Sequence, residues 1–376
     1  MVETTQERSI YDESEDIFVA SQWQLMWWRF KRHRPAIASS VILLIFYAVA
    51  LVAEFMGTGD PSFATHRFHL LRPQPIRWFD NGSFSPHVNG LEGFRDPFTL
   101  KKDYNVLPDE KLPVGFFVRG FEYTFMGFRI DRHLMGLKEY NDEKRSSLYI
   151  LGSDLIGRDV WSRLMIATRI SLSIGLVGVA LSFLFGVTLG AVSGFYGGWI
   201  DQVIQRMIEI LRSIPTIPLW MGLAAAIPQD WPVIKVYFSI TIILSFIGWT
   251  SLARVVRGKF LSLREEDFVM AARLAGASEM RVIFRHMVPS FTSHIVAAIT
   301  LAIPGMVISE TALSFLGLGL RPPAVSWGVM LKDAQNAQTV AVYPWLMIVA
   351  VPVIIAILAF NFMGDGLRDA ADPYSE

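Results

Sequence analysis

The sequence contains no cysteine and few charged residues. Without cysteine, this chain of 376 residues can form no disulfide framework, thiol nucleophile or cysteine-based metal site. Only 18% of its residues are charged, whereas soluble globular proteins carry about 25%. Two long blocks, 170–200 and 334–364, contain no Asp, Glu, Lys or Arg. Because 52% of the residues are hydrophobic, water is not expected to be the only solvent of this chain.

Several functional signals are missing as well. Basic and acidic residues number 34 each, so the chain has no excess of positive charge, and a nucleic-acid partner is not expected. No Gly-x-x-x-x-Gly-Lys-Ser/Thr phosphate loop occurs, and the chain is therefore not expected to hydrolyse ATP. His286 and His294 lack the spacing of a zinc hydrolase, and no Gly-x-Ser-x-Gly turn is present. We therefore expect this chain to have no catalytic residue and to bind no metal or cofactor.

Six segments are apolar and long enough to cross a hydrocarbon core of about 30 Å as helices. Buried helices of a large soluble protein usually have shorter apolar runs and a polar stripe. A signal peptide is not expected, because Met1–Asp16 is acidic and the first apolar run starts only after Pro35. The sequence therefore predicts an all-α membrane protein with six transmembrane helices. The predicted spans are Ala36–Met56, Ile170–Tyr196, Met207–Ile227, Val236–Val255, Ser290–Ile308 and Val342–Met363.

Basic residues indicate the orientation of these spans. Four of them precede the first span with no acidic residue nearby, and basic flanks of this kind stay on the cytoplasmic side. Counting the spans places the loop between the fourth and fifth on the same side. From Arg254 to Pro289 this loop holds seven basic and four acidic residues, which agrees with the assignment. Both termini are therefore expected to be cytoplasmic. The four basic residues are Arg29, Lys31, Arg32 and Arg34.

The segment before the first span is rich in tryptophan. Ile17–Lys31 is typical of a helix that lies in the lipid headgroup region, with its basic end against anionic lipid. Packing of the same tryptophans beneath the helix bundle remains open as an alternative.

A long polar stretch, Gly57–Thr168, separates the first two spans and is expected on the extracytoplasmic side. Short aromatic or β-branched pieces, Gly115–Arg119 and Glu122–Ile130, predict strands and hence a small β-rich insertion. A polar connection of this length is usually functional or disordered, and its aromatic content favours a folded piece.

Small residues and prolines stand out within the spans. Gly186, Gly190 and Gly194 are four residues apart, a spacing that lets a neighbouring helix approach closely. Prolines in four positions are compatible with kinked helices around a pathway, but prolines are ordinary in membrane bundles. No predicted span carries a carboxylate near its middle, which argues against transport driven by the chain's own ion coupling. The prolines are Pro215, Pro218, Pro304 and Pro352, and the charges nearest the bundle are Glu209, Arg212 and Glu310.

The cytoplasmic loop 257–289 is the most informative segment. Asp267–Pro289 is helical in composition, and Ala271 with Ala275, like Ala272 with Gly276, share a helix face. A short helix with a small-residue face can enter a cleft of another protein, and we expect no bundle for it to pack against in this loop. The acidic residues Glu265, Glu266 and Asp267 are expected to cap its N-terminus.

The run that contains Ala271, Ala272, Gly276 and Pro289 resembles the Glu-Ala-Ala loop of the membrane subunits of binding-protein-dependent ABC importers. Met270 stands where that family has Glu, and His286 and Val288 replace its usual Ile and Leu. Three further segments are similar to the second permease subunit of the dipeptide, oligopeptide and nickel importers. They are Leu151–Gly175, Glu310–Gly328 and Asn361–Pro373.

This resemblance implies a type I ABC importer permease in a bacterial inner membrane. It implies a homologous permease partner, two ATPase subunits that bind ATP and Mg, and an extracytoplasmic substrate-binding protein. The resemblance does not explain the outer domain Gly57–Ser147, which we expect to help receive the binding protein because so long a polar connection is usually functional. Peptides are the expected substrate, with oligosaccharides, opines and nickel as alternatives. A membrane scaffold or receptor and a self-sufficient secondary carrier remain rivals of a different class. The residues expected to couple to the ATPase are Glu266, Asp267, Ala271, Ala272, Ala275, Gly276 and Pro289. The expected divisions are 1–35, 36–56, 57–168, 169–364 and the tail 365–376.

Overall fold

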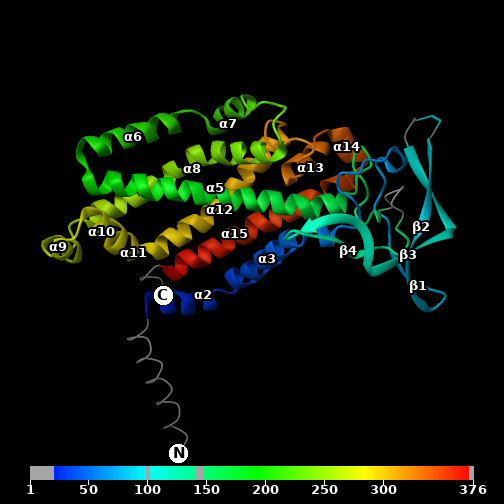
Figure 1. Ribbon diagram of the computed structural model, residues 1–376, viewed down its shortest axis with the longest axis horizontal. Helices are drawn as coiled ribbons and strands as arrows, with labels where there is room; N and C mark the ends of the chain where they lie inside the picture. The colour runs from blue at the N-terminus through cyan, green and yellow to red at the C-terminus, as the bar shows by residue number, and fades with distance from the viewer. Residues whose placement is uncertain (1–20, 96, 99–101, 141–146, 372–376) are drawn as a thin grey trace, which may run out of the picture.

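The computed structural model describes residues 21–95, 97–98, 102–140 and 147–371. Long helices lie side by side in a bundle with a four-stranded sheet at one end (Figure 1). Three short helices lie at the opposite end, namely α9 (Asp267–Leu274), α10 (Glu279–Arg281) and α11 (Val288–Ser290). We call these the sheet end and the α9 end.

Five helical runs in the described part of the chain are long and apolar enough to cross a membrane. They correspond to five of the six predicted spans, although α5 begins at Val160 rather than at Ile170, within the predicted outer domain. Helix α8 extends to Leu263 and so includes the first residues of the predicted cytoplasmic loop. The runs are α3 (Arg34–Leu51), α5 (Val160–Tyr196), α8 (Val233–Leu263), α12 (Thr292–Phe315) and Pro344–Ala371, which joins η3 (Pro344–Val349) to α15 (Ala350–Ala371).

The prediction of one continuous span over Met207–Ile227 is wrong. The structure has two helices there, α6 (Gly198–Ser213) and α7 (Thr216–Ala225). Proline disfavours the helical conformation in the residue before it, and Ile214 before Pro215 is extended, with ψ of 130°. The pair still carries the chain from the α9 end to the sheet end (Figure 1).

Shorter elements complete the bundle. Helix α2 (Gln22–Arg32) begins with a capping box between Ser21 and Gln24, in agreement with the predicted N-terminal helix, of which residues 17–20 lie outside the described part. Helix α2 and the C-terminal part of α15 both lie toward the α9 end (Figure 1). The other short elements are α4 (Ala53–Met56), η1 (His66–Phe68), the π-helical segment η2 (Val282–Met287), α13 (Trp327–Asp333) and α14 (Ala337–Val342).

The insertion between α4 and α5 forms an antiparallel sheet of order β1-β2-β3-β4. A small core of Val88, Val114, Leu137 and Leu148 holds it together. The predicted strand Glu122–Ile130 is wrong as a single element, because a two-residue turn divides it between β3 and β4. The strands are β1 (Arg77–Asp80), β2 (Ser83–Arg95), β3 (Lys102–Phe125) and β4 (Phe128–Leu137).

Helices α5 and α8 lie close together along Gly186, Gly190 and Gly194, three of the glycines of α5. A Cβ atom on Gly190 would lie 2.6 Å from the carbonyl oxygen of Ala253 and 2.9 Å from Cβ of Val256. On Gly186 and Gly194 it would lie 2.9 Å from Cβ of Leu252 and 2.6 Å from Cβ of Phe260, respectively. Only a residue without a side chain fits this contact.

We expect Gly190→Ala to lower the unfolding temperature of the purified protein, because the added methyl group meets backbone that cannot move aside. Overpacking of this kind costs about 1–3 kcal/mol. Gly258→Ala on α8 is the matched control, since a Cβ there meets nothing within 4 Å and alanine favours a helix by about 0.5–1 kcal/mol over glycine. Equal unfolding temperatures for the two variants would contradict the close contact.

Candidate functional site

Helix α9 has one buried and one exposed face. Its Val269 is fully buried and packs in a cluster with Phe195 at the end of α5 and Phe260 in α8. The expectation that this loop has no bundle to pack against is therefore wrong. Ala271 and Ala275 are exposed on the other face, and Ala272 is half-buried beside the cluster. The bundle thus holds α9 while leaving its small residues accessible.

The two ends of α9 are built differently. At the C-terminus, Gly276 adopts a φ of +79°, and its N–H donates to the carbonyl of Arg273 while the N–H of Ala277 donates to that of Ala272. This pair of hydrogen bonds is a Schellman motif, which favours glycine at its left-handed position. At the N-terminus, Glu266 occupies the cap position, but its side chain makes no capping hydrogen bond, and Asp267 lies in the first turn. The C-terminus of α9 is therefore fixed by hydrogen bonds, whereas its N-terminus has no side-chain cap.

An open groove adjoins the small face of α9. Ala272, Ala275 and Ala277 line one part of it, and Arg281, Arg285 and His286 line the rest. Exposed apolar side chains flank it, including Leu274, which is 87% exposed. Pro289 is also exposed but belongs to α11 rather than to α9. The α9 end therefore offers a surface of small, apolar and basic groups.

Ion pairing fixes α6 to α8 near the same end. Arg257 Nε lies 2.6 Å from Asp201 Oδ1, and Arg257 Nη2 lies 2.5 Å from Asp201 Oδ2. A two-point contact of this kind sets the orientation of the two helices as well as their separation.

A second candidate region is a cavity of about 470 Å³ between α5, α6, α7, α8 and α12. The sequence had indicated no residues of a pathway. Arg212 lies in the wall and donates from Nη1 to Oγ of Ser251 at 3.0 Å. Gly305 of α12 also lines it, with no atom within 4 Å of where a side chain would begin. The wall further carries the hydroxyl groups of Ser182, Thr216, Thr250 and Ser309.

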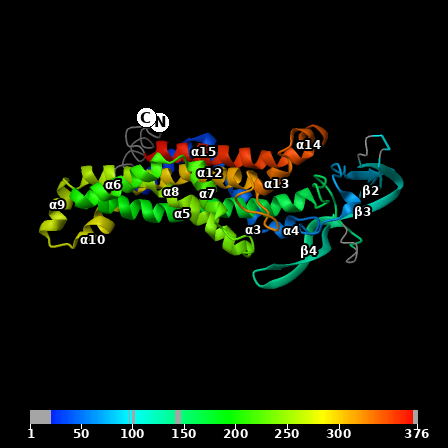
Figure 2. The same ribbon diagram turned by 90° about the horizontal axis from the view of Figure 1, so that it is seen from above.

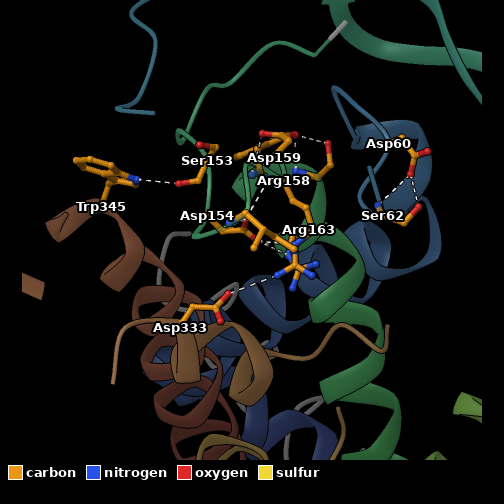
Figure 3. Close-up of polar contacts among 12 residues, drawn as sticks. Asp60, Ser62, Ser153, Asp154, Arg158, Asp159, Arg163, Asp333 and Trp345 are labelled. Atoms are coloured by element: carbon orange, nitrogen blue, oxygen red, sulfur yellow. Dashed lines mark hydrogen bonds and ion pairs between the residues drawn. The ribbon is translucent and has the colours of Figure 1, made fainter. Parts of the chain in front are cut away.

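Sequence reasoning missed a charged cluster at the sheet end (Figure 3). Asp154 and Arg163 are 3% and 2% exposed, and Arg163 Nε lies 3.5 Å from Asp154 Oδ2. Arg158 lies 2.6 Å from Asp154 through Nε and 3.6 Å from Asp333 of α13 through Nη2. The alternating acids and bases of residues 154–163, just before an apolar run, were the available signal. The cluster joins the start of α5 to α13.

Asp159 is a fully buried carboxylate next to this cluster, at the N-cap of α5. Its Oδ2 accepts from the N–H of Ser162 at 3.0 Å and lies 2.9 Å from Oγ1 of Thr58. Burial raises the pKa of this carboxyl to about 6, although these hydrogen bonds oppose the shift. The segment around Thr58 is thereby attached to the bundle.

Glu310 is the other fully buried carboxylate, inside α12. It accepts from Oγ of Ser314 at 2.8 Å and from Oγ of Ser171 at 3.2 Å. Ser171 in turn accepts from the N–H of Trp327, so Glu310 links α5, α12 and α13. Across the described residues, no three His, Asp or Glu side chains are placed to hold a metal ion.

Comparison with known proteins matches two parts of the chain to described families. Residues 186–374 match the binding-protein-dependent transport system inner membrane component. Residues 21–73 match the N-terminal TM domain of oligopeptide transport permease C. The first match includes α9, its groove and most of the cavity wall. Neither match includes the strands β1–β4.

Individual relatives agree with these matches. The chain is 38% identical to the oligopeptide transport system permease protein OppC of Bacillus subtilis, over 62% of this chain and 74% of that protein. It is 39% identical to the glutathione transport system permease protein GsiD of Pectobacterium atrosepticum, over 62% and 75%. Among solved structures, an inward-facing MetNI methionine ABC transporter is similar, with 19% identity and a TM-score of 0.44 over 55% of this chain and 95% of that one.

The buried Asp159 predicts a pH effect on stability. The pKa of an aspartate in an unfolded chain is about 3.9, so between about pH 4 and pH 6 the folded protein holds the proton more tightly. The contribution of Asp159 to the free energy of unfolding is therefore lost as the pH rises through that window, and it amounts to about 3 kcal/mol. We expect Asp159→Asn, which keeps an N-cap acceptor, to show a smaller fall in unfolding temperature from pH 4 to pH 6. A fall identical to that of the unaltered chain would show that Asp159 ionises normally.

Proposed function

Because the chain belongs to the binding-protein-dependent transport system inner membrane component family, we propose that it forms one half of the translocation pathway of an ATP-driven importer for di- or oligopeptides. The observation that carries the proposal is the placement of α9. It is exposed on its small-residue face, anchored through Val269 on its inner face, and lies at the end of the bundle opposite the sheet.

The proposed assembly contains a related permease, two ATPase subunits that bind ATP and Mg, and an extracytoplasmic substrate-binding protein. ATP binding would move the ATPase subunits, and α9 would transmit that motion to α5 and α8, against which it packs. A helix in loose contact with the bundle could not favour one arrangement of the spanning helices over another. Because α9 is packed in one apolar cluster with α5 and α8, a change in its position can do so.

The proposed topology has six crossings with both termini in the cytoplasm. Helices α6 and α7 together make the sixth crossing, because they return the chain from the α9 end to the sheet end (Figure 1). The basic residues ahead of α3 and in the α9 loop support a cytoplasmic α9 end. The sheet is then extracytoplasmic.

The proposed substrate follows from the relatives and from the cavity. Permeases for oligopeptides and for glutathione are both similar to this chain. The cavity wall combines hydroxyl groups with the guanidinium of Arg212, and these groups suit the carbonyls and the C-terminal carboxylate of a peptide. We therefore propose that this cavity lines the pathway.

Docking of the ATPase is tested best by Ala275→Trp. Gly276→Trp would confuse docking with backbone strain, because Gly276 has a positive φ. We expect Ala275→Trp to reduce ATPase affinity about tenfold or more, corresponding to about 1.4 kcal/mol, with the unfolding temperature unchanged. Asp109→Trp, exposed on β3 at the other end, is the control for ATPase affinity and unfolding temperature. Co-purification and substrate-stimulated ATP hydrolysis at normal levels in Ala275→Trp would rule out this dock.

The pathway is tested by filling the cavity at Gly305. We expect Gly305→Phe to lower peptide uptake into proteoliposomes while ATPase docking and basal hydrolysis persist, because the new side chain enters the cavity and not the helix contacts. Gly222→Phe on α7 is the control, since that position is equally open but does not line the cavity. Undiminished uptake by Gly305→Phe would place the pathway elsewhere.

We also propose that the sheet helps to receive the binding protein. A deletion that tests this should spare Thr58, which contacts Asp159, and Leu71, whose backbone pairs with Ser153. Replacing residues 77–137 by a Gly/Ser linker should leave ATPase docking intact and reduce the stimulation of hydrolysis by loaded binding protein. If stimulation and uptake match those of the unaltered importer, the sheet has another role.

A further inference from the structure

The β3–β4 hairpin leaves the sheet and turns back along the side of the bundle (Figures 1 and 2). His133 of β4 anchors it: this side chain is buried, with Nδ1 2.9 Å from the carbonyl oxygen of Glu54 and Nε2 2.9 Å from that of Phe121. The ring of Phe117 also lies 6.0 Å from that of Phe55 in α4. The hairpin is therefore held in a defined place beside the bundle.

The tip of the hairpin lies where the bundle changes from charged to apolar. Thr124, Phe125 and Met126 border a shared groove with α3 and α5. On the bundle side, this groove includes the ion pair of Glu54 with Arg169, the last charges before the apolar part of both helices. Beyond that pair, the groove is lined by Tyr47, Leu51, Leu172 and Leu176 of the spanning helices.

The tip of the hairpin exposes large apolar side chains. Met126 is 75% exposed and Phe128 is 73% exposed. Arg129 and Arg132 follow on β4 and are exposed as well. Apolar side chains at the tip, with guanidinium groups one and four residues after Phe128, match the order of acyl chains and phosphates in a lipid leaflet.

The backbone conformation of the turn does not favour methionine, which indicates that the Met126 side chain has a role of its own. Met126 and Gly127 have φ of +48° and +89°, the pattern of a type I′ turn, which favours Asn, Asp or Gly at both positions. The β1–β2 turn has the same pattern at Asn81 and Gly82, with the preferred residues. That turn lies away from the bundle (Figure 1). Of these two turns, the one that reaches the spanning helices has the less suitable residue.

We infer that the β3–β4 hairpin tip inserts into the outer leaflet of the membrane, with Met126 and Phe128 among the acyl chains and the arginines at the phosphates. Exposed apolar side chains of α3 and α5, such as Leu51 and Leu176, line the same groove as the tip, and apolar side chains on a spanning helix favour lipid as the occupant. This inference requires only that α3 and α5 span a membrane, and it holds whatever the substrate is. The sheet would then be fixed to the bilayer as well as to the bundle.

The absence of cysteine in the chain allows a direct test. Met126→Cys and Asn81→Cys, the equivalent positions of the two turns, are each labelled with the same fluorophore in the full chain, co-purified with its partners and reconstituted into liposomes. Leu44→Cys, exposed in the middle of α3, serves as the lipid-facing reference. The liposomes carry phospholipids with a nitroxide quencher either shallow or deep in the acyl chain.

We expect the label at Met126→Cys to lose fluorescence with both lipids, more with the shallow one. The Leu44→Cys label should respond more to the deep quencher, and the Asn81→Cys label should respond to neither. Equal responses at positions 126 and 81 would overturn the inference. Cross-linking of Met126→Cys to a protein partner without quenching would also overturn it, since the occupant would then be protein.

Discussion

The close contact between α5 and α8 is the feature on which the rest of the structure depends. Helix α5 has 37 residues, which corresponds to a length of about 55 Å. It starts directly after the buried N-cap Asp159 and ends at Tyr196, next to Phe195, which packs in the cluster that holds α9. Because the backbones of α5 and α8 meet at three glycines, little space is left between the two helices. In the proposed mechanism, a displacement of α9 would act on this pair rather than on a single helix.

Each end of this helix pair is secured by a different kind of interaction. At the sheet end, buried charges and hydrogen bonds dominate, as in the cluster of Asp154, Arg158 and Arg163. At the α9 end, apolar packing around Phe260 dominates, and polar contacts such as that of Arg257 with Asp201 lie at its edge. Breaking one partner of a buried charge pair is costly, whereas apolar surfaces can shift against each other at lower cost. The two ends of the helix pair are therefore held by interactions of different kinds.

The sequence predicted the spans well because apolar composition over about 20 residues is a local property. It failed at Met207–Ile227, where composition alone concealed the break before Pro215. It placed the small face of Ala271 and Ala275 correctly as exposed but missed the opposite face, since the packing of Val269 needs α5 and α8 to be positioned first. It also missed the cavity, because its wall depends on how five helices pack together, with lining residues from Val179 to Ser309.

What the sequence by itself determined is the solvent of the long segments: the charge-free blocks 170–200 and 334–364 require a membrane, and the polar composition of the insertion as a whole indicates water. The spacing of Gly186, Gly190 and Gly194 likewise predicted a close helix contact, because residues four apart lie on the same face of a helix. Only the tertiary structure decided which helix meets that face. It also decided that Asp159 and Glu310 are buried, and that the β3–β4 hairpin turns back to the bundle. These depend on contacts between residues far apart in the chain, whose energies no local pattern of residues records.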